Sequence, residues 1–356
     1  MNKVYTALVA GILIGLIVGA AVAWVVKPVP ATPTFNKIGI ILGTGGLGDK
    51  SFNDIAYAGA VRARDELGIV FDYAEPKAIS EYEGFQTNFA KTGEYALIVC
   101  VGFDQADALN KTAAAYPNQN FAIVDMVVDR PNVASLLFKA NEGSFLTGVV
   151  AGMLTQTGKV GFVGGMDIPL IRDFFVGYEA GVEWANPSAT VLDPVFVGGW
   201  GDPTKGKELS ISLIGLGADA IFAAAGKSGL GALEGIHENG KIGFGVDACQ
   251  DYLYPEIKAS MTKRVDVAVY EMIKAAVTSK VMPKLDAEHG GFKGGVYSGG
   301  VAEKWTGCSR LPEEQGFWES TFSFTETPLP ANVLSQLTEA RDGIIAGTIT
   351  VPSGYA

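Results

Sequence analysis

Short apolar runs alternate with longer mixed segments along most of this 356-residue chain. Runs rich in β-branched and aromatic residues predict strands, whereas apolar positions that recur every three or four residues predict helices. Strands are expected over residues 38–42, 69–73, 97–101, 121–124, 133–138, 160–163, 190–197, 220–223 and 242–246. Helices are expected between them, for example over 56–67, 203–216 and 229–239. Strands that alternate with helices predict parallel sheets covered on both faces.

The alternation occurs in two successive series of similar length. The first ends near residue 138 and the second begins near Lys159, with no low-complexity linker between them. Two α/β lobes of like topology are therefore expected. Towards the C-terminus, residues 294–300 are typical of a strand and turn, and an amphipathic helix over 333–347 precedes a last short strand over 348–352.

The N-terminal segment has a different character, because Val4 to Val26 carry no charge. A helix of this length spans ~34 Å, enough to cross the ~30 Å hydrocarbon layer of a bilayer. We predict an uncleaved anchor in the cell membrane, with Lys3 inside and the rest of the chain outside the cytoplasm. A signal peptide cleaved near residues 21–23 is the alternative. No lipobox cysteine follows, so no lipid anchor is expected, and the three prolines of residues 27–34 predict a stiff spacer.

Composition excludes several functions. The formal net charge of −11 and the lack of a basic stripe argue against a nucleic-acid partner, since phosphate neutralisation needs clustered Lys and Arg. Two histidines and three widely spaced cysteines, Cys100, Cys249 and Cys308, offer little material for a zinc site or a His-based triad. We therefore expect no metal and no cofactor.

The most informative stretch is Gly43 to Asn53, which follows a predicted strand and precedes a predicted helix. A strand, a glycine turn and a helix start in this order present backbone N–H groups to a ligand. Ser51 to Asp54 match a capping box for the helix, and Gly68 matches its end.

The same stretch matches two nucleotide motifs in part. Residues 43–48 satisfy G-x-G-x-x-G, with Asp72 further on, so a NAD-dependent oxidoreductase is one alternative. Residues 49–53 intervene before the helix, however, whereas the third glycine of that motif should begin it. A P-loop is excluded, because Asp49 stands where its lysine is required.

Residues 46–53 resemble the Gly-Gly-x-x-Asp-Lys-Ser-Phe-Asn motif of the basic membrane protein family. The likeness extends from about residue 38 to 352. It includes residues 121–125, 132–138, 142–146, 158–166, 202–207, 245–247 and 263–270. Characterised members are substrate-binding proteins of ABC importers and mostly bind purine nucleosides.

The resemblance implies a type I periplasmic-binding-protein fold, in which two α/β lobes hold a ligand in the cleft between them. We expect residues 35–139 and 262–298 to form one lobe and residues 140–261 and 299–356 to form the other, after a leading segment, residues 1–34. The implied protein is a monomer and not an enzyme. It closes around a nucleoside and delivers it to an ABC permease. A sensor that signals through the anchor is an alternative.

The family motif implies aromatic contacts for two residues. Phe52 matches the aromatic side chain that stacks on the base, and Trp200 stands where relatives often have Phe. Two flat side chains from opposite lobes can hold a heterocycle between them. The alternative is that Phe52 only packs at the start of its helix and Trp200 fills a gap between the lobes.

Polar candidates complete the expected site. Asp247 and Lys263 match the ribose-binding acid and amine of the family, unless they form an exposed pair at the hinge. Asn53 can donate and accept hydrogen bonds, which suits a base edge or a sugar hydroxyl, or it caps its helix. Asp125, also at a strand end, and the backbone of Gly226 are further candidates.

One position departs from the family. Most relatives have Asp at the position of Gly43, where the carboxylate meets the base edge. Its loss leaves the identity of the base open. We also consider a larger flat ligand such as a flavin, which would occupy the vacated space and stack on Trp200.

Overall fold

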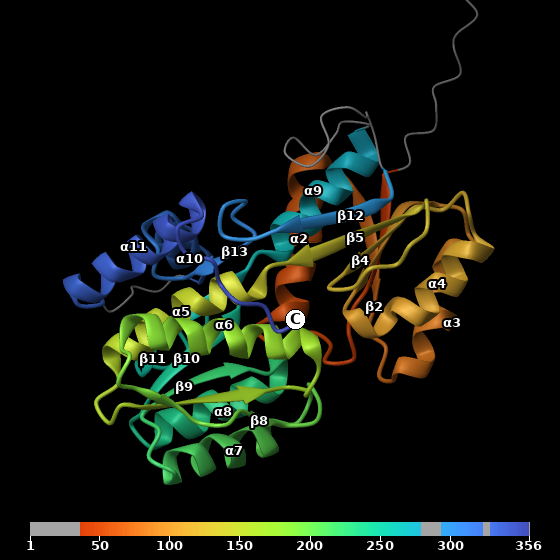
Figure 1. The fold of residues 1–356 in the computed structure, drawn as a ribbon. Coiled ribbons are helices and arrows are strands. Elements are labelled where there is room, and N and C mark those ends of the chain that lie inside the picture. Colours follow the sequence, from red (N-terminus) through yellow and green to blue (C-terminus); the bar gives the residue numbers. More distant parts are fainter. Residues whose placement is uncertain (1–35, 279–292, 323–327, 356) are drawn as a thin grey trace, which may run out of the picture. The chain divides into compact units, whose positions relative to one another are not determined.

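The computed structural model describes residues 36–278, 293–322 and 328–355, which belong to one compact unit of the chain. The expected segment 1–34 lies outside these ranges. Two sheets organise the described part (Figure 1). In the first sheet the strand order is β12-β5-β4-β3-β1-β2, and each neighbouring pair is parallel. Its strands are β1 (Lys37–Ile41), β2 (Val70–Ala74), β3 (Tyr95–Val101), β4 (Phe121–Val124), β5 (Val133–Phe138) and β12 (Gly295–Gly299).

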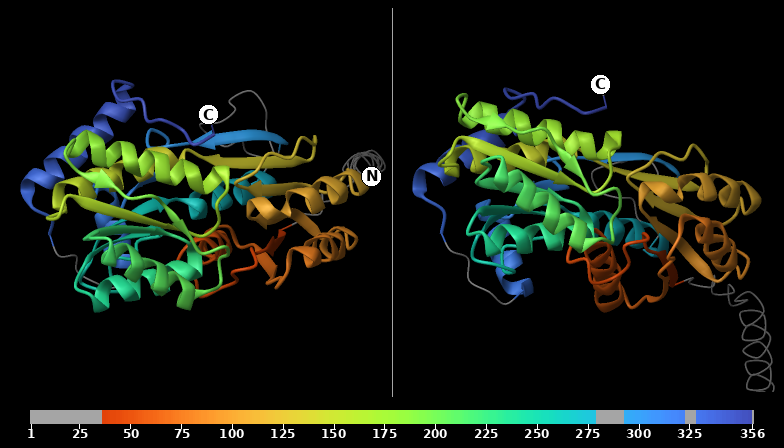
Figure 2. Two further views of the ribbon diagram at one scale, coloured as in Figure 1. Left: turned by 60° about the horizontal axis from the view of Figure 1, so that its bottom comes forward. Right: turned by 90° about the horizontal axis from the view of Figure 1, so that it is seen from below.

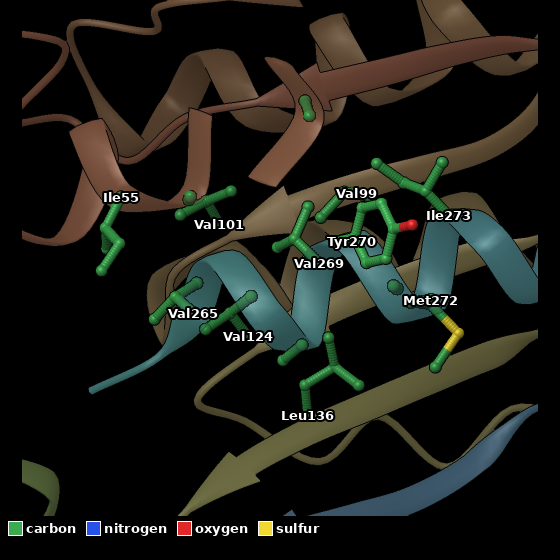
Figure 3. Packing of buried hydrophobic residues seen from close by; sticks show 14 of the residues in the cluster. Ile55, Val99, Val101, Val124, Leu136, Val265, Val269, Tyr270, Met272 and Ile273 are labelled. Atoms are coloured by element: carbon green, nitrogen blue, oxygen red, sulfur yellow. The ribbon is translucent and has the colours of Figure 1, made fainter. Parts of the chain in front are cut away.

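Helices cover both faces of the first sheet. Hydrophobic residues of α2 (Phe52–Leu67) and α9 (Val265–Thr278) form one core with the strands. Figure 3 shows Val265 and Val269 of α9 beside Val99 and Val124. On the other face lie α3 (Tyr82–Ala90) and α4 (Ala106–Ala115), with the short 3-10 helices η1 (Ile79–Glu81) and η2 (Phe103–Gln105). Because both faces are covered, strands such as β4 are buried throughout, which explains their continuous apolar runs.

The second sheet repeats this plan with the strand order β13-β11-β10-β9-β6-β7, and β8 also pairs with β6. Its strands are β6 (Lys159–Gly164), β7 (Thr190–Val191), β8 (Val195–Phe196), β9 (Ala220–Ala224), β10 (Ile242–Asp247), β11 (Ile257–Lys263) and β13 (Thr306–Cys308). On one face lie α5 (Ala140–Leu154) and α6 (Pro169–Ala185), and on the other α7 (Pro203–Gly215) and α8 (Gly226–Glu238) (Figure 2). The last two helices are α10 (Pro312–Phe322) and α11 (Ala331–Ala346).

Within the described residues, the chain passes between the two sheets at three places. These are β5 to α5, β11 to α9, and β12 to β13. Backbone hydrogen bonds tie the three crossings together: the N–H of Lys139 donates to Gly299 O at 2.9 Å, and the N–H of Arg264 donates to Trp305 O at 2.8 Å. The crossings therefore form one hydrogen-bonded bundle beside the carboxyl ends of β4, β10 and β11.

The expected alternation of strands and helices is confirmed, and three details differ. Residues 190–197 form two short strands rather than one, and β13 runs antiparallel to β11, so the second sheet is not wholly parallel. The strand expected over 348–352 is wrong. This segment is irregular, and the Asn141 side chain donates to Val351 O and Pro352 O. The backbone groups of the tail thus find side-chain partners instead of a strand.

Helices α5 and α6 approach each other closely at glycines. A side chain at Gly181 would collide with the carbonyl oxygen of Phe145, and one at Gly148 would collide with that of Tyr178. Gly181→Ala should therefore lower the free energy of unfolding by about 1–3 kcal/mol, because backbone must move to admit the methyl group.

The matched control is Gly84→Ala, at an exposed position in the first turn of α3, where an added methyl group meets nothing within 4 Å. This variant should gain about 0.5–1 kcal/mol, since alanine has the higher helix propensity. Urea denaturation measures both variants. Shifts of equal size and sign would contradict the close approach of α5 and α6.

Candidate functional site

A pocket opens where the carboxyl ends of the strands of both sheets meet, with an empty volume of about 670 Å³ that extends to its mouth. Its walls come from segments that follow β1, β3 and β4 in the first sheet and β6, β9, β10 and β11 in the second. This is where parallel α/β sheets usually bind ligands. It brings together all seven residues that the sequence analysis selected, namely Phe52, Asn53, Asp125, Trp200, Gly226, Asp247 and Lys263.

The loop between β1 and α2 is held by the carboxylate of Asp49, which is 1% exposed. Its oxygens accept hydrogen bonds from the N–H groups of Ser51, Asn53 and Asp54, and from the Asn53 side chain at 3.0 Å. Burial raises the pKa of Asp49, while these N–H donors oppose the shift. The capping box expected at Ser51 is therefore wrong, because Asp49 caps α2 and the Ser51 side chain points elsewhere. The expected helix end at Gly68 is confirmed, in a left-handed conformation.

Asn53 takes part in the same network. Its Oδ1 accepts a hydrogen bond from the N–H of Gly43 at 2.8 Å, while its Nδ2 donates to Asp49. Asn53 thus fixes the glycine turn at the pocket wall. A side chain at Gly43 would come within 3.3 Å of both Asn53 Oδ1 and the carbonyl oxygen of Val101. A Cβ at this position would therefore meet close neighbours, and Gly43 itself lines the pocket.

Two aspartates lie at equivalent places in the two sheets, Asp125 after β4 and Asp247 at the end of β10. Both have left-handed backbones, with φ of 69° and 64°. Non-glycine residues seldom adopt this conformation, and such strain is concentrated at functional sites. The strain turns both carboxylates into the pocket.

The two carboxylates have different partners. Lys263, at the end of β11, forms an ion pair with Asp125 of the first sheet. The Ser51 hydroxyl donates to Asp247 Oδ2 at 2.6 Å and so joins the first sheet's loop to the second sheet. Lys263 is 2% exposed and Asp247 is 6% exposed, which contradicts the alternative of an exposed hinge pair. Burial raises the pKa of Asp247 to about 6, although the Lys263 ammonium and the Ser51 hydroxyl favour the ionised form.

Aromatic side chains line the pocket from both sides. Phe52 comes from the start of α2, and its ring centroid lies 5.0 Å from the Lys263 ammonium. Trp200 follows β8 and packs directly over Gly165, where any side chain would collide with its ring. The ring of Phe103 meets Trp200 edge-on, with centroids 6.5 Å apart. Phe52 and Trp200 thus belong to different halves of the molecule and face one cavity.

Comparison with known proteins identifies the family. The family model described as ABC transporter substrate-binding protein PnrA-like matches residues 36–296. The chain belongs to this family. An uncharacterized lipoprotein of Pyrococcus horikoshii is 35% identical over 298 residues, which cover 80% of this chain and 71% of that protein. Basic membrane protein A of Borreliella burgdorferi is 32% identical over 243 residues, which cover 65% and 70%.

Solved structures agree with this assignment. The crystal structure of an ABC transporter solute-binding protein from Aeropyrum pernix has a TM-score of 0.75 at 30% identity and covers 89% of this chain and 93% of that one. The expected type I periplasmic-binding-protein fold is confirmed. The PnrA-like family consists of substrate-binding proteins rather than enzymes.

The dinucleotide alternative finds no support in this substrate-binding protein. Asp72 lies on the edge strand β2, outside the pocket lining. It forms an ion pair with Lys37 and accepts a hydrogen bond from the Tyr95 hydroxyl, and these contacts lower its pKa. The carboxylate therefore stabilises the sheet edge instead of meeting a ribose.

The sequence analysis missed several residues that line the pocket of this substrate-binding protein, among them Asp49, Phe103, Asp104 and Phe174. Phe103 and Asp104 come two and three residues after the end of the predicted strand 97–101, so their position near a strand end was a signal that could have identified them. The sequence analysis treated Asp49 as the residue that stands in place of a P-loop lysine and as part of the family motif, but it did not select Asp49 as a pocket residue. Nothing local marks Phe174, which faces the pocket from inside α6.

The membrane anchor expected over Val4–Val26 lies outside the described residues. Among the residues that the structure does describe, no helix is both long and apolar enough to cross a bilayer. Several relatives are named lipoproteins or basic membrane proteins.

The raised pKa of Asp247 can be tested on the ligand-free protein. A folded-state pKa of about 6, above the ordinary 3.8, means that the folded protein binds this proton more tightly than the unfolded chain does. The free energy of unfolding should therefore fall as the pH rises from about 4 to above 6. Asp247→Asn removes the titration, so the variant should gain about 1–3 kcal/mol relative to wild type over this range. Urea denaturation of ligand-free protein from pH 4 to 7.5 measures the difference. A difference that does not vary with pH would contradict the assignment.

Proposed function

We propose that this protein is the extracytoplasmic receptor of an ABC importer that binds a purine nucleoside between its two lobes. The main support is the composition of one cavity. It has aromatic side chains on two opposite sides, from Phe52 and Trp200, and a cluster of buried charges formed by Asp125, Asp247 and Lys263. A nucleoside has the matching parts, a flat base and a sugar with several hydroxyl groups.

The aromatic part suits the base. A heterocycle stacked between Phe52 and Trp200 would gain on the order of 1–3 kcal/mol from each ring, by analogy with base stacking in nucleic-acid complexes. The contact of Trp200 with Gly165 and with the edge of Phe103 keeps the indole in place. Little side-chain freedom would then be lost on binding.

The charged part suits the sugar. Ionised carboxylates accept strong hydrogen bonds from hydroxyl groups, and the Lys263 ammonium donates to sugar oxygens. Asp247 already accepts one hydroxyl hydrogen bond, from Ser51, and a carboxylate has further lone pairs available. Gly226 begins α8, so its N–H group has no partner within the helix and is available to a ligand.

Hinge closure is the proposed mechanism. We assign residues 35–139 and 262–298 to one lobe and 140–261 and 299–356 to the other, although β11 continues in the second sheet as far as Lys263. The three bundled crossings form the hinge. The Ser51–Asp247 hydrogen bond and the one from Gln250 Nε2 to Lys50 O join the lobes. A ligand that contacts both lobes favours the closed form, which a permease then recognises.

The proposal places the binding unit outside the cytoplasm as a monomer, tethered to the membrane by residues 1–34. Relatives named lipoproteins and basic membrane proteins support a membrane-associated location.

The proposed function is tested with Phe52→Ala and Asp247→Ala in the full-length protein, purified in detergent. Each variant should lose at least about tenfold in affinity for guanosine, adenosine or inosine, because it removes a stacking surface or a buried acceptor. Isothermal titration calorimetry measures the affinity, and a single cooperative thermal unfolding transition of each ligand-free variant shows that the variant is folded. Tyr73→Ala is the matched control, since Tyr73 is 45% exposed on β2 and away from the pocket.

Native mass spectrometry of the gently purified wild-type protein provides an independent test, because lobe closure slows the release of a bound ligand. Bound purine nucleoside would support the proposal. The absence of any nucleoside binding, by mass spectrometry and by calorimetry, would overturn it.

A further inference from the structure

Asp104 differs from the other carboxylates of the pocket. It lies in η2, directly after β3, and its Oδ2 accepts a hydrogen bond from the Tyr82 hydroxyl at 3.0 Å. That hydroxyl in turn accepts the N–H of Thr44 at 3.1 Å. Tyr82 is fully buried in the core beneath the pocket wall. The Thr44–Tyr82–Asp104 chain therefore holds the carboxylate in one orientation.

Asp104 also has no positive partner, as judged from residues 36–278, 293–322 and 328–355. Asp125 is paired with Lys263, and Asp49 accepts hydrogen bonds from several N–H groups. The side chain of Asp104 receives a hydrogen bond from Tyr82 and one from its own backbone. An ionised carboxylate has about four acceptor positions, so acceptor capacity remains unused at this wall of the pocket.

The free part of this carboxylate faces the place where a flat ligand would present its edge. Gly102 has a φ of 121°, which favours glycine. A Cβ atom at this residue would lie 3.0 Å from Asp104 Oδ1 and 3.8 Å from Cε1 of the Phe52 ring. The missing side chain thus leaves open space bordered by both groups. A base stacked on Phe52 would reach this space with its edge.

We propose that Asp104 is the residue that determines base specificity, by accepting the two adjacent N–H donors of a guanine edge. This inference rests on the proposed nucleoside-binding function. Guanine offers N1–H and the 2-amino group side by side, which match the two acceptor oxygens of a carboxylate. Hypoxanthine offers N1–H alone. Xanthine has a carbonyl group where guanine has the 2-amino group, and that oxygen would face the carboxylate and be repelled.

The test compares guanosine with inosine, which lacks only the 2-amino group, by isothermal titration calorimetry on the full-length protein. Wild type should bind guanosine about tenfold more tightly, in line with the discrimination of bidentate contacts to a base edge. It should also bind 1-methylguanosine more weakly than guanosine, because methylation removes the N1–H donor. This comparison needs no variant and therefore does not depend on how a variant folds.

Asp104→Asn should reduce the guanosine preference to within about twofold, since an amide oxygen is a weaker acceptor than a carboxylate and the amide NH₂ opposes the ligand's donors. Tyr82→Phe should reduce it in part, because Tyr82 acts by positioning Asp104. Asp107→Asn is the matched control: Asp107 is an exposed residue of α4 with the same change of charge, and the preference should stay intact.

The outcomes separate the two proposals. Equal wild-type affinities for guanosine and inosine, or a preference that survives in Asp104→Asn, would overturn the role of Asp104 and leave the nucleoside-binding function in place. Failure of every nucleoside to bind the wild-type protein would overturn both.

Discussion

The buried ammonium group of Lys263 is the interaction on which the site depends most. An ammonium removed from water needs a close negative partner, and Asp125 provides it from the opposite sheet. The rings of Phe52, Phe138 and Phe174 surround the same nitrogen at 5.0–5.5 Å from their centroids. The nitrogen lies over each of these rings, within the usual distance for cation–π attraction to their electron-rich faces. One charge thus connects β11, β4, α2 and α6 at the place where the chain crosses between the sheets.

In the loop that follows β1, a buried carboxylate accepts the backbone hydrogen bonds that strand or helix pairing would otherwise satisfy. Asp49 satisfies the first N–H groups of α2, and Asn53 connects this network to the glycine turn at Gly43. Phe52 therefore projects from the first residue of α2, directly after a loop whose backbone is fixed by hydrogen bonds rather than by strand pairing. Because Asp49 caps the helix, the Ser51 hydroxyl donates its hydrogen bond to Asp247 in the other half of the molecule instead.

Stability and binding make opposite demands on this pocket. The left-handed backbones of Asp125 and Asp247 are strained, and burial holds the pKa of Asp247 near 6, so the ionised form is disfavoured in the folded protein. A sheet selected for stability alone would have apolar residues at these strand ends. The continuous apolar cores beneath the pocket, such as β4 and β9, stabilise the fold enough to tolerate these groups.

Sequence alone was sufficient for features that depend on local pattern. Apolar runs predicted the bounds of β4 and β5 to the residue, because a strand buried on both faces is predominantly apolar. The seven candidate residues meet in one pocket because the carboxyl ends of parallel strands lie along the same edge of a sheet. Features that depend on distant partners were decided only by the tertiary structure. The antiparallel pairing of β13 with β11, the irregular tail at 348–352 and the choice of Asp49 over Ser51 as the cap of α2 are of this kind. In each case the segment or side chain forms a hydrogen bond with a residue far away in the sequence, up to about two hundred positions, instead of the pairing that its local sequence favours. The neighbouring sequence gives no information about that distant partner.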